Sequence, residues 1–271
     1  GIILGMNDIS SIRTNADKEQ IDNFRDLIIS YSTDPRVILL KLADRLEVMR
    51  SLAMFPEKKR LSKSWESLNL YAEIAHKLGL YAMKSEMEDL SLKYIEPDAY
   101  NHIVESLKDS EKERLAFIEE FLAPVRRLLD EDGIKYHIKS RTKSVFSIYQ
   151  KMKKQQVPFS GVYDIFALRI IIDSPLESEK RLCWTAYSHV TSLYTPNPKR
   201  MRDWISIPKS NGYESLHTTV VTESGRWVEV QIRTERMDEV AERGIAAHWR
   251  YKGVKQGGMG AEEWLGRLRE L

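Results

Sequence analysis

The sequence predicts an α+β protein in which an all-helical N-terminal unit precedes a unit of mixed helices and strands. Two observations support this class. The first third of the chain carries apolar residues at helical spacing, whereas β-branched and alternating runs follow Asp132-Gly133. The simplest division joins the two units near residues 95–115. We therefore expect a helical domain at residues 1–95 and a second domain at residues 96–271.

The N-terminal unit contains four segments with the periodicity of amphipathic helices, separated by Pro and Gly breakers. These segments are residues 21–32, 36–54, 65–78 and 81–93. A longer amphipathic helix is expected at residues 98–130, and Asp132-Gly133 is a typical signal for its end.

The second unit alternates strands and helices. Ser140 is expected to cap a helix that runs to residue 154, because a serine hydroxyl accepts a hydrogen bond from the first free backbone N–H groups. Strands are expected at residues 136–139, 165–172, 216–222 and 227–233. Further helices are expected at residues 177–193 and 237–249, followed by a flexible Gly-rich segment at residues 253–260.

The composition indicates a soluble globular protein, since 30% of the 271 residues are charged and 42% are hydrophobic. The formal net charge of +2 argues against a protein that coats nucleic acids. No apolar run is long enough to span a bilayer. The single Cys183 excludes an intrachain disulfide and fits a reducing compartment. We expect a cytoplasmic protein that binds neither membrane nor nucleic acid. Because the chain opens at Gly1 without an initiator Met, we also expect a fragment of a longer protein.

Positive charge gathers in residues 133–163, which hold seven Lys and Arg residues and no Asp or Glu. On the expected helix, Lys143, Ser147 and Lys151 are four residues apart, so they line one stripe. Arg141 falls in its first turn, where free N–H groups and the helix dipole attract anions. An anionic ligand would relieve the repulsion between these like charges. The alternative is a solvated basic face.

A second cluster lies at residues 196–217, where cations surround a turn and are followed by an aromatic ring and an imidazole. Its members are Lys199, Arg200, Arg202, Lys209, Asn211, Gly212, Tyr213 and His217. Cations suit phosphates, an aromatic ring suits a base, and His and Asn suit sugar hydroxyls. The pattern is typical of a nucleotide pocket, with a basic surface loop as the alternative.

Two carboxylates stand among basic or apolar neighbours. Asp164 lies at the start of an apolar strand, and Glu229 shares one face of an alternating strand with Gln231 and Arg233. On adjacent strands, Asp164 and Glu229 would hold Mg²⁺ and activate a hydroxyl for attack on a phosphate. The alternative is a solvent-exposed polar face. The sequence has no P-loop, dinucleotide, kinase or zinc-protease motif, so phosphate chemistry needs a different kind of pocket.

Six longer motifs cover about residues 135–252. They are Ser140-Arg-Thr-Lys-Ser, Val162-Tyr-Asp-Ile-Phe-Ala-Leu-Arg-Ile, Pro198-Lys-Arg-Met-Arg-Asp-Trp-Ile, Pro208-Lys-Ser-Asn-Gly-Tyr-Glu-Ser-Leu-His-Thr-Thr-Val, Val228-Glu-Val-Gln-Ile-Arg-Thr and Ala246-Ala-His-Trp-Arg-Tyr-Lys. In content and order they resemble the RelA/SpoT homologue family. The resemblance implies a mixed sheet flanked by helices, as in nucleotidyltransferases. It also implies synthesis of (p)ppGpp, in which the β,γ-pyrophosphoryl group of ATP passes to the 3′-hydroxyl of GDP or GTP with Mg²⁺.

The resemblance assigns roles to the clusters. The residues similar to the family's ATP-phosphate site are Arg141, Lys143, Ser147 and Lys151. Asp164 resembles the family's Mg²⁺ ligand, and Glu229 resembles its second essential carboxylate, which shares the metal and takes the proton of the 3′-hydroxyl. The guanine nucleotide would contact Arg200, Arg202, Lys209, Asn211, Tyr213, His217 and Gln231, with the Tyr213 ring stacked on the base.

The N-terminal unit resembles the end of the family's helical (p)ppGpp hydrolase domain. Residues 37–46 match its last metal-binding helix, with Asp44 in a ligand position, but Glu47-Val48 replaces the usual His-Asn. The upstream His and His-Asp that hold Mn²⁺ are missing from the 271 residues. The resemblance therefore implies a partial domain without hydrolase activity, in which Mn²⁺ binds only if further residues complete the site.

The interpretation is thus a synthetase with ATP and GDP or GTP as substrates and Mg²⁺ as cofactor. Ribosome contact would need regulatory domains that this chain does not contain. Three alternatives remain: a catalytically silent nucleotide-binding module, a template-independent nucleotidyltransferase, and a bifunctional enzyme whose hydrolase site is completed by residues missing here.

Overall fold

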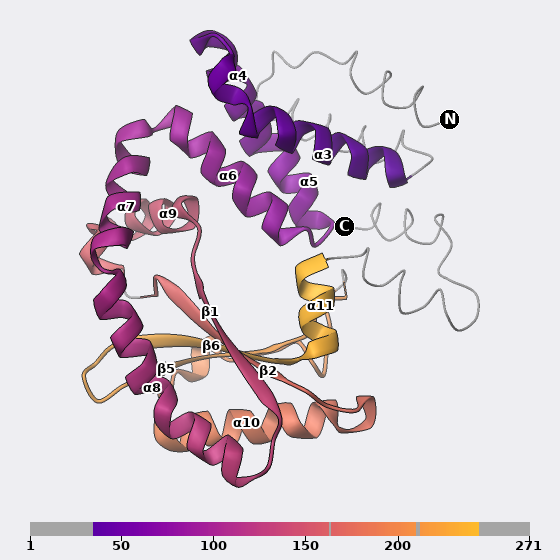
Figure 1. Cartoon of the computed structure of the whole chain (residues 1–271), viewed down its shortest axis with the longest axis vertical. Helices are drawn as coiled ribbons and strands as arrows, with labels where there is room; N and C mark the ends of the chain where they lie inside the picture. The colour runs from indigo at the N-terminus through magenta and orange to yellow at the C-terminus, as the bar shows by residue number, and fades with distance from the viewer. Residues whose placement is uncertain (1–34, 163, 210–211, 244–271) are drawn as a thin grey trace. The chain divides into compact units, whose positions relative to one another are not determined.

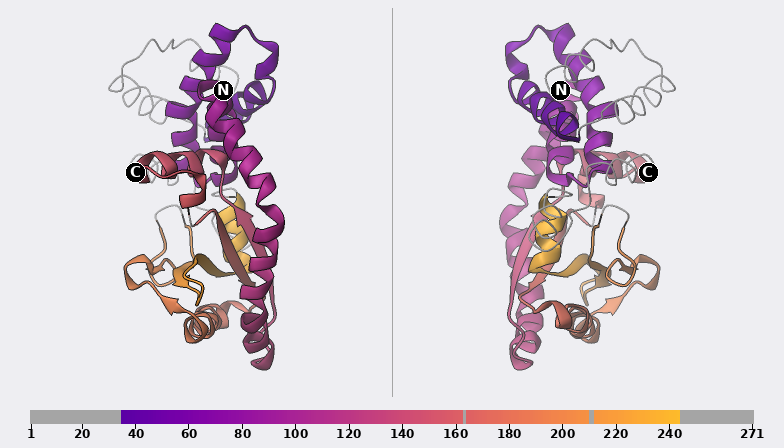
Figure 2. Two further views of the ribbon diagram at one scale, coloured as in Figure 1. Left: turned by 90° about the vertical axis from the view of Figure 1, so that its left-hand side faces the viewer. Right: turned by 90° about the vertical axis from the view of Figure 1, so that its right-hand side faces the viewer.

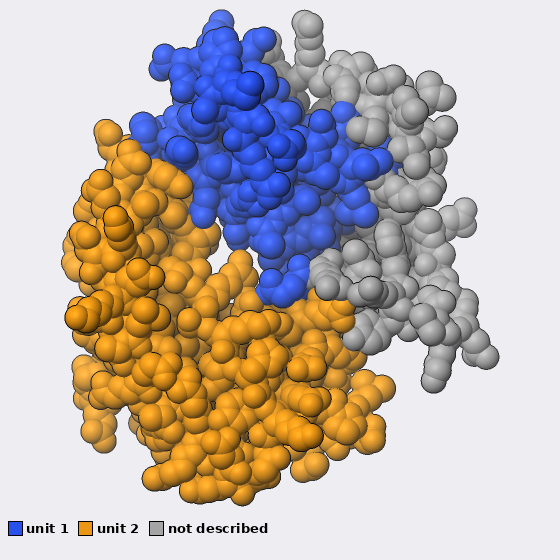
Figure 3. Space-filling model, viewed as in Figure 1, with its two compact units in different colours: residues 1–97, 242–271 blue, residues 98–241 orange. Residues whose placement is uncertain are grey.

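The computed structural model describes residues 35–243 except residues 163, 210 and 211. Residues 35–97 together with residues 242–243 belong to one compact unit, and residues 98–241 form another (Figure 3). The expected helix at residues 21–32, the Gly-rich segment at residues 253–260 and the end of the last expected helix lie outside the described residues.

The first unit is helical, as expected. Its elements are α3 (Pro35–Arg50), a 3-10 turn (Leu52–Met54), α4 (Glu57–Glu66), a π-helical turn (Ser67–Tyr71), α5 (Ala72–Lys77) and α6 (Tyr81–Ile95) (Figure 1). The helix expected at residues 65–78 therefore starts earlier, directly after Pro56, and contains one wider turn. Ile38 of α3, Ile74 of α5 and Met87 of α6 are at most 2% exposed and lie in one hydrophobic core.

The long helix expected at residues 98–130 is two helices, α7 (Pro97–Asp109) and α8 (Glu111–Glu131). The break is at Ser110, whose hydroxyl donates to the carbonyl of Ser106 at 2.8 Å and accepts from the Arg114 guanidinium at 2.8 Å. A serine side chain that bonds the backbone in this way competes with the helix hydrogen bonds and weakens the helix locally. The expectation of one continuous helix was therefore wrong, because the helix is interrupted at Ser110.

The second unit is built on a mixed sheet with the strand order β1-β2-β6-β5-β3, and β4 pairs with β5. β2 and β6 are parallel, and the other pairs are antiparallel. The strands are β1 (Tyr136–Thr142), β2 (Phe166–Ile172), β3 (Thr195–Pro196), β4 (Arg202–Asp203), β5 (Leu216–Val221) and β6 (Trp227–Thr234). The remaining helices are α9 (Val145–Gln155), α10 (Glu179–Leu193) and α11 (Glu235–Arg243). The α+β class is thereby confirmed. Within the described part of the chain, no helix combines the length and the apolar character needed to cross a membrane.

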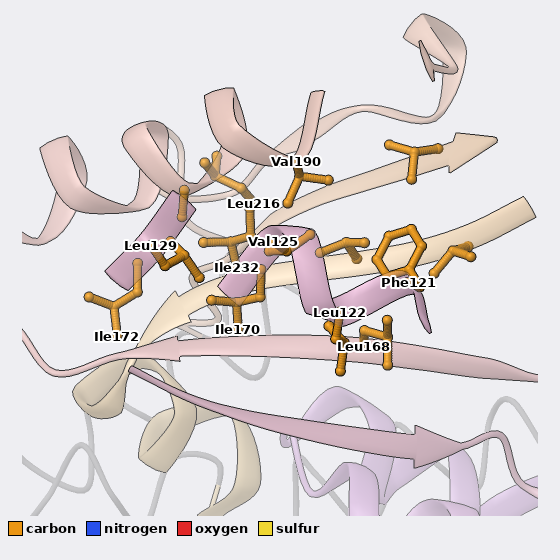
Figure 4. Close-up of a cluster of buried hydrophobic side chains, with 14 of the residues drawn as sticks. Phe121, Leu122, Val125, Leu129, Leu168, Ile170, Ile172, Val190, Leu216 and Ile232 are labelled. Atoms are coloured by element: carbon orange, nitrogen blue, oxygen red, sulfur yellow. The ribbon is translucent and has the colours of Figure 1, made fainter. Parts of the chain in front are cut away.

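α8 and α10 cover one face of the sheet and supply its hydrophobic core (Figures 1 and 2). Leu168 and Ile170 of β2 and Ile232 of β6 are at most 1% exposed and cluster with Val125 of α8 (Figure 4). Val230 of β6 is fully buried in the same cluster. Burial of one such side chain contributes about 1.5–3 kcal/mol. The alternation predicted for β6 is confirmed, because its apolar residues face this core and leave the polar residues Glu229 and Gln231 on the opposite face.

The helix expected to be capped by Ser140 is α9, which is capped by Ser144, four residues later. β1 continues to Thr142 because it pairs with β2 along its whole length. The N-cap is Ser144, whose hydroxyl accepts a hydrogen bond from the backbone N–H of Ser147 at 3.2 Å. Arg141 therefore lies on a strand, and the argument that it attracts anions through a helix dipole was wrong.

Candidate active site

Four charged side chains meet on the polar face of the sheet. Lys143 Nζ lies 3.0 Å from Asp164 Oδ2 and 2.9 Å from Glu229 Oε2, and Lys151 forms a second ion pair with Asp164. The four side chains are between 15% and 28% exposed. Two cations and two anions thus share a partly enclosed space and balance each other's charge. We call these residues the charged cluster.

The charged cluster is assembled from four places in the chain. Lys143 directly follows β1, and its backbone N–H donates to the carbonyl of Ile165 at 2.8 Å. Lys151 lies about two helical turns further along, on α9. Asp164 comes just before β2, and Glu229 lies on the neighbouring β6. The parallel pairing of β2 with β6 is what brings the two carboxylates together.

The ion pairs decide the charge states. For Asp164, burial alone would raise the pKa, but hydrogen bonds from Lys151 and Lys143 outweigh it and lower the pKa. For Glu229, attraction to Lys143 and a hydrogen bond from Gln231 outweigh burial in the same way. Burial and then the neighbouring Lys143 lower the pKa of Lys151, whereas attraction to Glu229 outweighs burial and raises the pKa of Lys143. Both carboxylates are therefore ionised at neutral pH.

A row of polar residues crosses the same face of the sheet. The strand pairing places Arg202 of β4, His217 of β5, Gln231 of β6 and Arg169 of β2 side by side. Paired residues on neighbouring strands point to the same face, so the row shares the face of Glu229. Gln231 joins the row to the charged cluster, because its Nε2 donates to Glu229 Oε1 at 2.9 Å and its Oε1 accepts from Arg169 Nε at 3.3 Å.

Tyr213 and His217 form a pair beside this row. Tyr213 Oη lies 2.7 Å from His217 Nε2, and the two rings meet edge to face. Lys209 Nζ lies 5.1 Å from the centre of the Tyr213 ring and 4.9 Å from that of Trp204, within range of cation–π attraction. Burial lowers the pKa of His217 to about 4, so its imidazole is neutral at neutral pH. Tyr213 is only 8% exposed, so the pair places a largely buried aromatic ring and an uncharged imidazole next to a cation.

Arg141 and Ser147, which the family resemblance assigned to the ATP phosphates, lie in different local structures. Arg141 lies on β1 opposite Ala167, which in turn lies opposite Glu229, so Arg141 and Glu229 are on the same face. The hydroxyl of Ser147 is 2.8 Å from that of Ser144, its partner in the helix cap. Arg141 thus remains close to the charged cluster, whereas the visible hydrogen bonds of Ser147 serve the start of α9.

The other residues predicted to bind a nucleotide or a metal do not belong to the charged cluster. Arg200 is exposed in the turn before β4. The guanidinium of Arg202 donates to the carbonyls of Lys199 and Met201 at 2.9 and 2.7 Å. Asn211 lies outside the described residues. Asp44 is exposed on α3, in the other unit. No group of three or more His, Cys, Asp or Glu side chains with metal-binding geometry occurs among residues 35–243, gaps excepted.

Sequence reasoning missed Arg169. It is the single charged side chain of β2, and it is only 8% exposed, beside Gln231. Arginine is rarely buried without partners. An arginine in the middle of an otherwise apolar strand was therefore the signal that this face of β2 has polar partners.

Two family models match the chain. A family described as "Region found in RelA / SpoT proteins" matches residues 140–256, and a family described as "HD domain" matches residues 2–81. The first match includes all members of the charged cluster as well as Tyr213 and His217.

Curated relatives match nearly the whole chain. A guanosine-3′,5′-bis(diphosphate) 3′-pyrophosphohydrolase of Aquifex aeolicus is 40% identical over 99% of this chain and 38% of its own length. A GTP pyrophosphokinase of Myxococcus xanthus is 40% identical over 97% of this chain and 34% of its own length. The bifunctional (p)ppGpp synthase/hydrolase SpoT of Escherichia coli is 38% identical over 100% of this chain and 38% of its own length. The chain thus spans about a third of the length of the curated relatives it matches.

Among solved structures, the small alarmone synthetase 1 of Bacillus subtilis bound to its product pppGpp is 27% identical, with a TM-score of 0.36 over 57% of this chain and 86% of that chain. A GTP pyrophosphokinase family protein of Streptococcus pneumoniae is 21% identical, with a TM-score of 0.38 over 61% of this chain and 85% of that chain.

Proposed function

We propose, because this chain belongs to the RelA/SpoT family, that its second unit synthesises (p)ppGpp by moving the β,γ-pyrophosphoryl group of ATP to the 3′-hydroxyl of GDP or GTP. The observation that supports this most is the place of Lys143, whose ammonium group lies within 3.0 Å of both Asp164 and Glu229. A triphosphate that attracts this lysine would leave two adjacent carboxylates ready for a cation and a hydroxyl.

Asp164 and Glu229 fit a magnesium ion. Oxygens of both converge on one ammonium nitrogen, at 3.0 and 2.9 Å, so both can reach a single small cation. Mg²⁺ is commonly held by one or two carboxylates, with substrate phosphates and waters as the other ligands. When bound, Mg²⁺ would neutralise charge on the transferred group and make the 3′-hydroxyl more acidic.

The cations of the site would hold the phosphates of ATP. Lys143 and Lys151 already lie beside carboxylates, and Arg141 projects from β1 on the same face. Phosphate oxygens compete for the same ammonium protons, and such charge-assisted hydrogen bonds are among the stronger ones in proteins. Held in this way, the triphosphate would present its β-phosphorus near Glu229.

Glu229 would accept the proton of the 3′-hydroxyl. The bond between O3′ and the β-phosphorus forms, the bond from that phosphorus to the oxygen shared with the α-phosphate breaks, and AMP leaves with this oxygen. Gln231 holds the Glu229 carboxylate in place, because its Nε2 donates to Glu229 Oε1 at 2.9 Å. A lowered pKa keeps Glu229 ionised and able to accept it.

Product analysis tests this function. The chain is incubated with Mg²⁺, GDP and ATP labelled at the γ-phosphate, and the label is expected in guanosine tetraphosphate with one AMP released for each. Transfer of AMP to the acceptor with release of pyrophosphate would instead indicate nucleotidyl transfer. Binding of both nucleotides without any product would indicate a silent nucleotide-binding module.

Tyr213→Ala is expected to weaken the binding of GDP and not of ATP, because base stacking on an aromatic ring contributes about 1–3 kcal/mol. Calorimetric titration with each nucleotide measures the two affinities. Tyr213→Phe is the matched control, since it keeps the ring and removes only the hydroxyl that lies 2.7 Å from His217. Equal weakening of both nucleotides in Tyr213→Ala would show that the ring supports the whole pocket and not the base.

We further expect that this chain does not hydrolyse ppGpp. A manganese hydrolase site needs several converging ligands, and the sequence offers Asp44 followed by Glu47-Val48 where the family has His-Asn. Incubation with ppGpp and Mn²⁺, with release of pyrophosphate as the readout, tests this. Release above background that disappears in Asp44→Ala would contradict the prediction.

A further inference from the structure

A second, partly buried ion cluster lies beyond the carboxyl end of β6, apart from the charged cluster. The guanidinium of Arg236, at the start of α11, bonds two carboxylates at once. Its Nε and Nη2 donate to Glu179 at 2.7 to 3.1 Å, and its Nη1 lies 2.6 Å from Glu214 Oε2. The hydroxyl of Thr234 also donates to Glu179 at 2.6 Å. We call this set the arginine clamp.

The arginine clamp joins three separate segments. Glu179 is the first residue of α10, Thr234 and Arg236 span the junction of β6 and α11, and Glu214 lies just before β5. Glu179 is 5% exposed, so its charge depends on its partners. For Arg236, burial alone would lower the pKa, but hydrogen bonds to Glu179 and Glu214 outweigh it and raise the pKa. Without the guanidinium, two carboxylates would face each other at the edge of a packed core.

Glu214 connects the arginine clamp to the nucleotide site because it directly follows Tyr213. Tyr213 pairs with His217 on the polar face, while the next side chain turns to Arg236. Beyond Glu214, the carbonyl of Ser215 accepts from the backbone N–H of Trp204 at 3.0 Å, and its hydroxyl donates to the carbonyl of Ile232 at 3.2 Å. The backbone that directly follows Tyr213 is thus held by the contact of Glu214 with Arg236 and by the two hydrogen bonds of Ser215.

We infer that Arg236 is a positioning residue: by holding Glu214 against Glu179 it fixes the backbone that presents the Tyr213 ring to the guanine base. The inference rests on the proposed function only for the identity of the base. The mechanical part, that Arg236 orders residues 213–217, stands on the contacts themselves.

Arg236→Gln is expected to raise the KM for GDP by about tenfold. In this variant residues 213–217 would become ordered only when GDP binds, and the entropy cost of that ordering would weaken the binding. The KM for ATP and the kcat at saturating GDP are expected to stay within about twofold. Arg236→Lys keeps the charge but cannot fork between two carboxylates, so it should restore only part of the GDP affinity. An equal rise of both KM values, or no rise for GDP, would overturn the inference.

Glu214→Gln separates the positioning role from general stability, since it loosens the loop side and leaves Arg236 paired with Glu179. It is expected to reproduce the effect on GDP without lowering the thermal midpoint as far as Arg236→Gln does. Arg226→Gln is the matched control, because it breaks an exposed ion pair with Glu113 of similar length, 2.6 Å. A GDP effect of the same size in Arg226→Gln would count against the inference.

Hydrogen exchange tests the mechanical part even if the wild-type chain makes no (p)ppGpp. Amides of residues 213–217 are expected to exchange faster in Arg236→Gln than in the wild type, with the amides of β2 unchanged. Such a result together with inactive wild-type protein would reject the proposed function and keep the positioning role. Unchanged exchange at residues 213–217, or equally faster exchange in β2, would reject the positioning role.

Discussion

Asp164→Asn is expected to abolish pyrophosphoryl transfer while leaving the protein folded. The substitution keeps the volume of the side chain and removes its charge. Asp164 is the carboxylate that both Lys143 and Lys151 contact, and in the proposed mechanism it is a ligand of Mg²⁺. Loss of metal-assisted charge neutralisation costs several kcal/mol of transition-state stabilisation, which corresponds to a fall in kcat of about 10³-fold or more.

The matched control is Asp173→Asn, because Asp173 follows the other end of β2 and is exposed. Both variants are compared by transfer of label from ATP and by thermal unfolding. We expect Asp164→Asn to unfold near the wild-type temperature, since Lys143 keeps its pair with Glu229 and the lysines are partly solvated. Turnover near the wild-type rate in a folded Asp164→Asn protein would remove this carboxylate from the mechanism.

The regular elements of the second unit could be predicted because their patterns are local. The alternation in β6 placed Val230 and Ile232 in the core and Glu229 on the other face, and burial confirms this. The start of α9 could not be predicted in the same way. Ser140 and Ser144 are equally suitable N-cap residues by type. The helix begins after Ser144 because β1 pairs with β2 as far as Thr142.

The candidate site depended even more on contacts that the sequence does not show. Asp164 and Glu229 are 65 positions apart, and only the parallel pairing of β2 with β6 makes them neighbours. From the sequence, the magnesium site could be predicted only on the condition that the two strands are adjacent, and the sequence does not show whether they are. The roles of Arg169 and Arg236 could not be predicted for the same reason, since the role of a charged residue depends on the carboxylates or amides that the fold brings next to it.

Lys143→Met is expected to lower kcat by about 10²- to 10³-fold, the usual effect of removing one donor that stabilises charge in a transition state. Its ammonium group lies between the two carboxylates at 3.0 and 2.9 Å and is the cation best placed to follow a phosphate toward Glu229. Titration with a non-hydrolysable ATP analogue should show weaker binding, whereas GDP binding at Tyr213 should stay within about twofold.

Lys154→Met is the control for Lys143→Met, because Lys154 is exposed in the last turn of α9 and a lysine there contributes charge without a partner carboxylate in the charged cluster. If general positive charge were what attracts ATP, the two variants would lose activity to a similar degree. If the position between Asp164 and Glu229 is what matters, only Lys143→Met loses activity. Lys143→Arg is then expected to recover ATP binding better than turnover, because a guanidinium keeps the charge but is larger and planar, unlike the compact ammonium group. Full turnover in Lys143→Met would therefore contradict the first step of the mechanism, in which the ammonium group of Lys143 leaves the carboxylates and binds a phosphate of ATP.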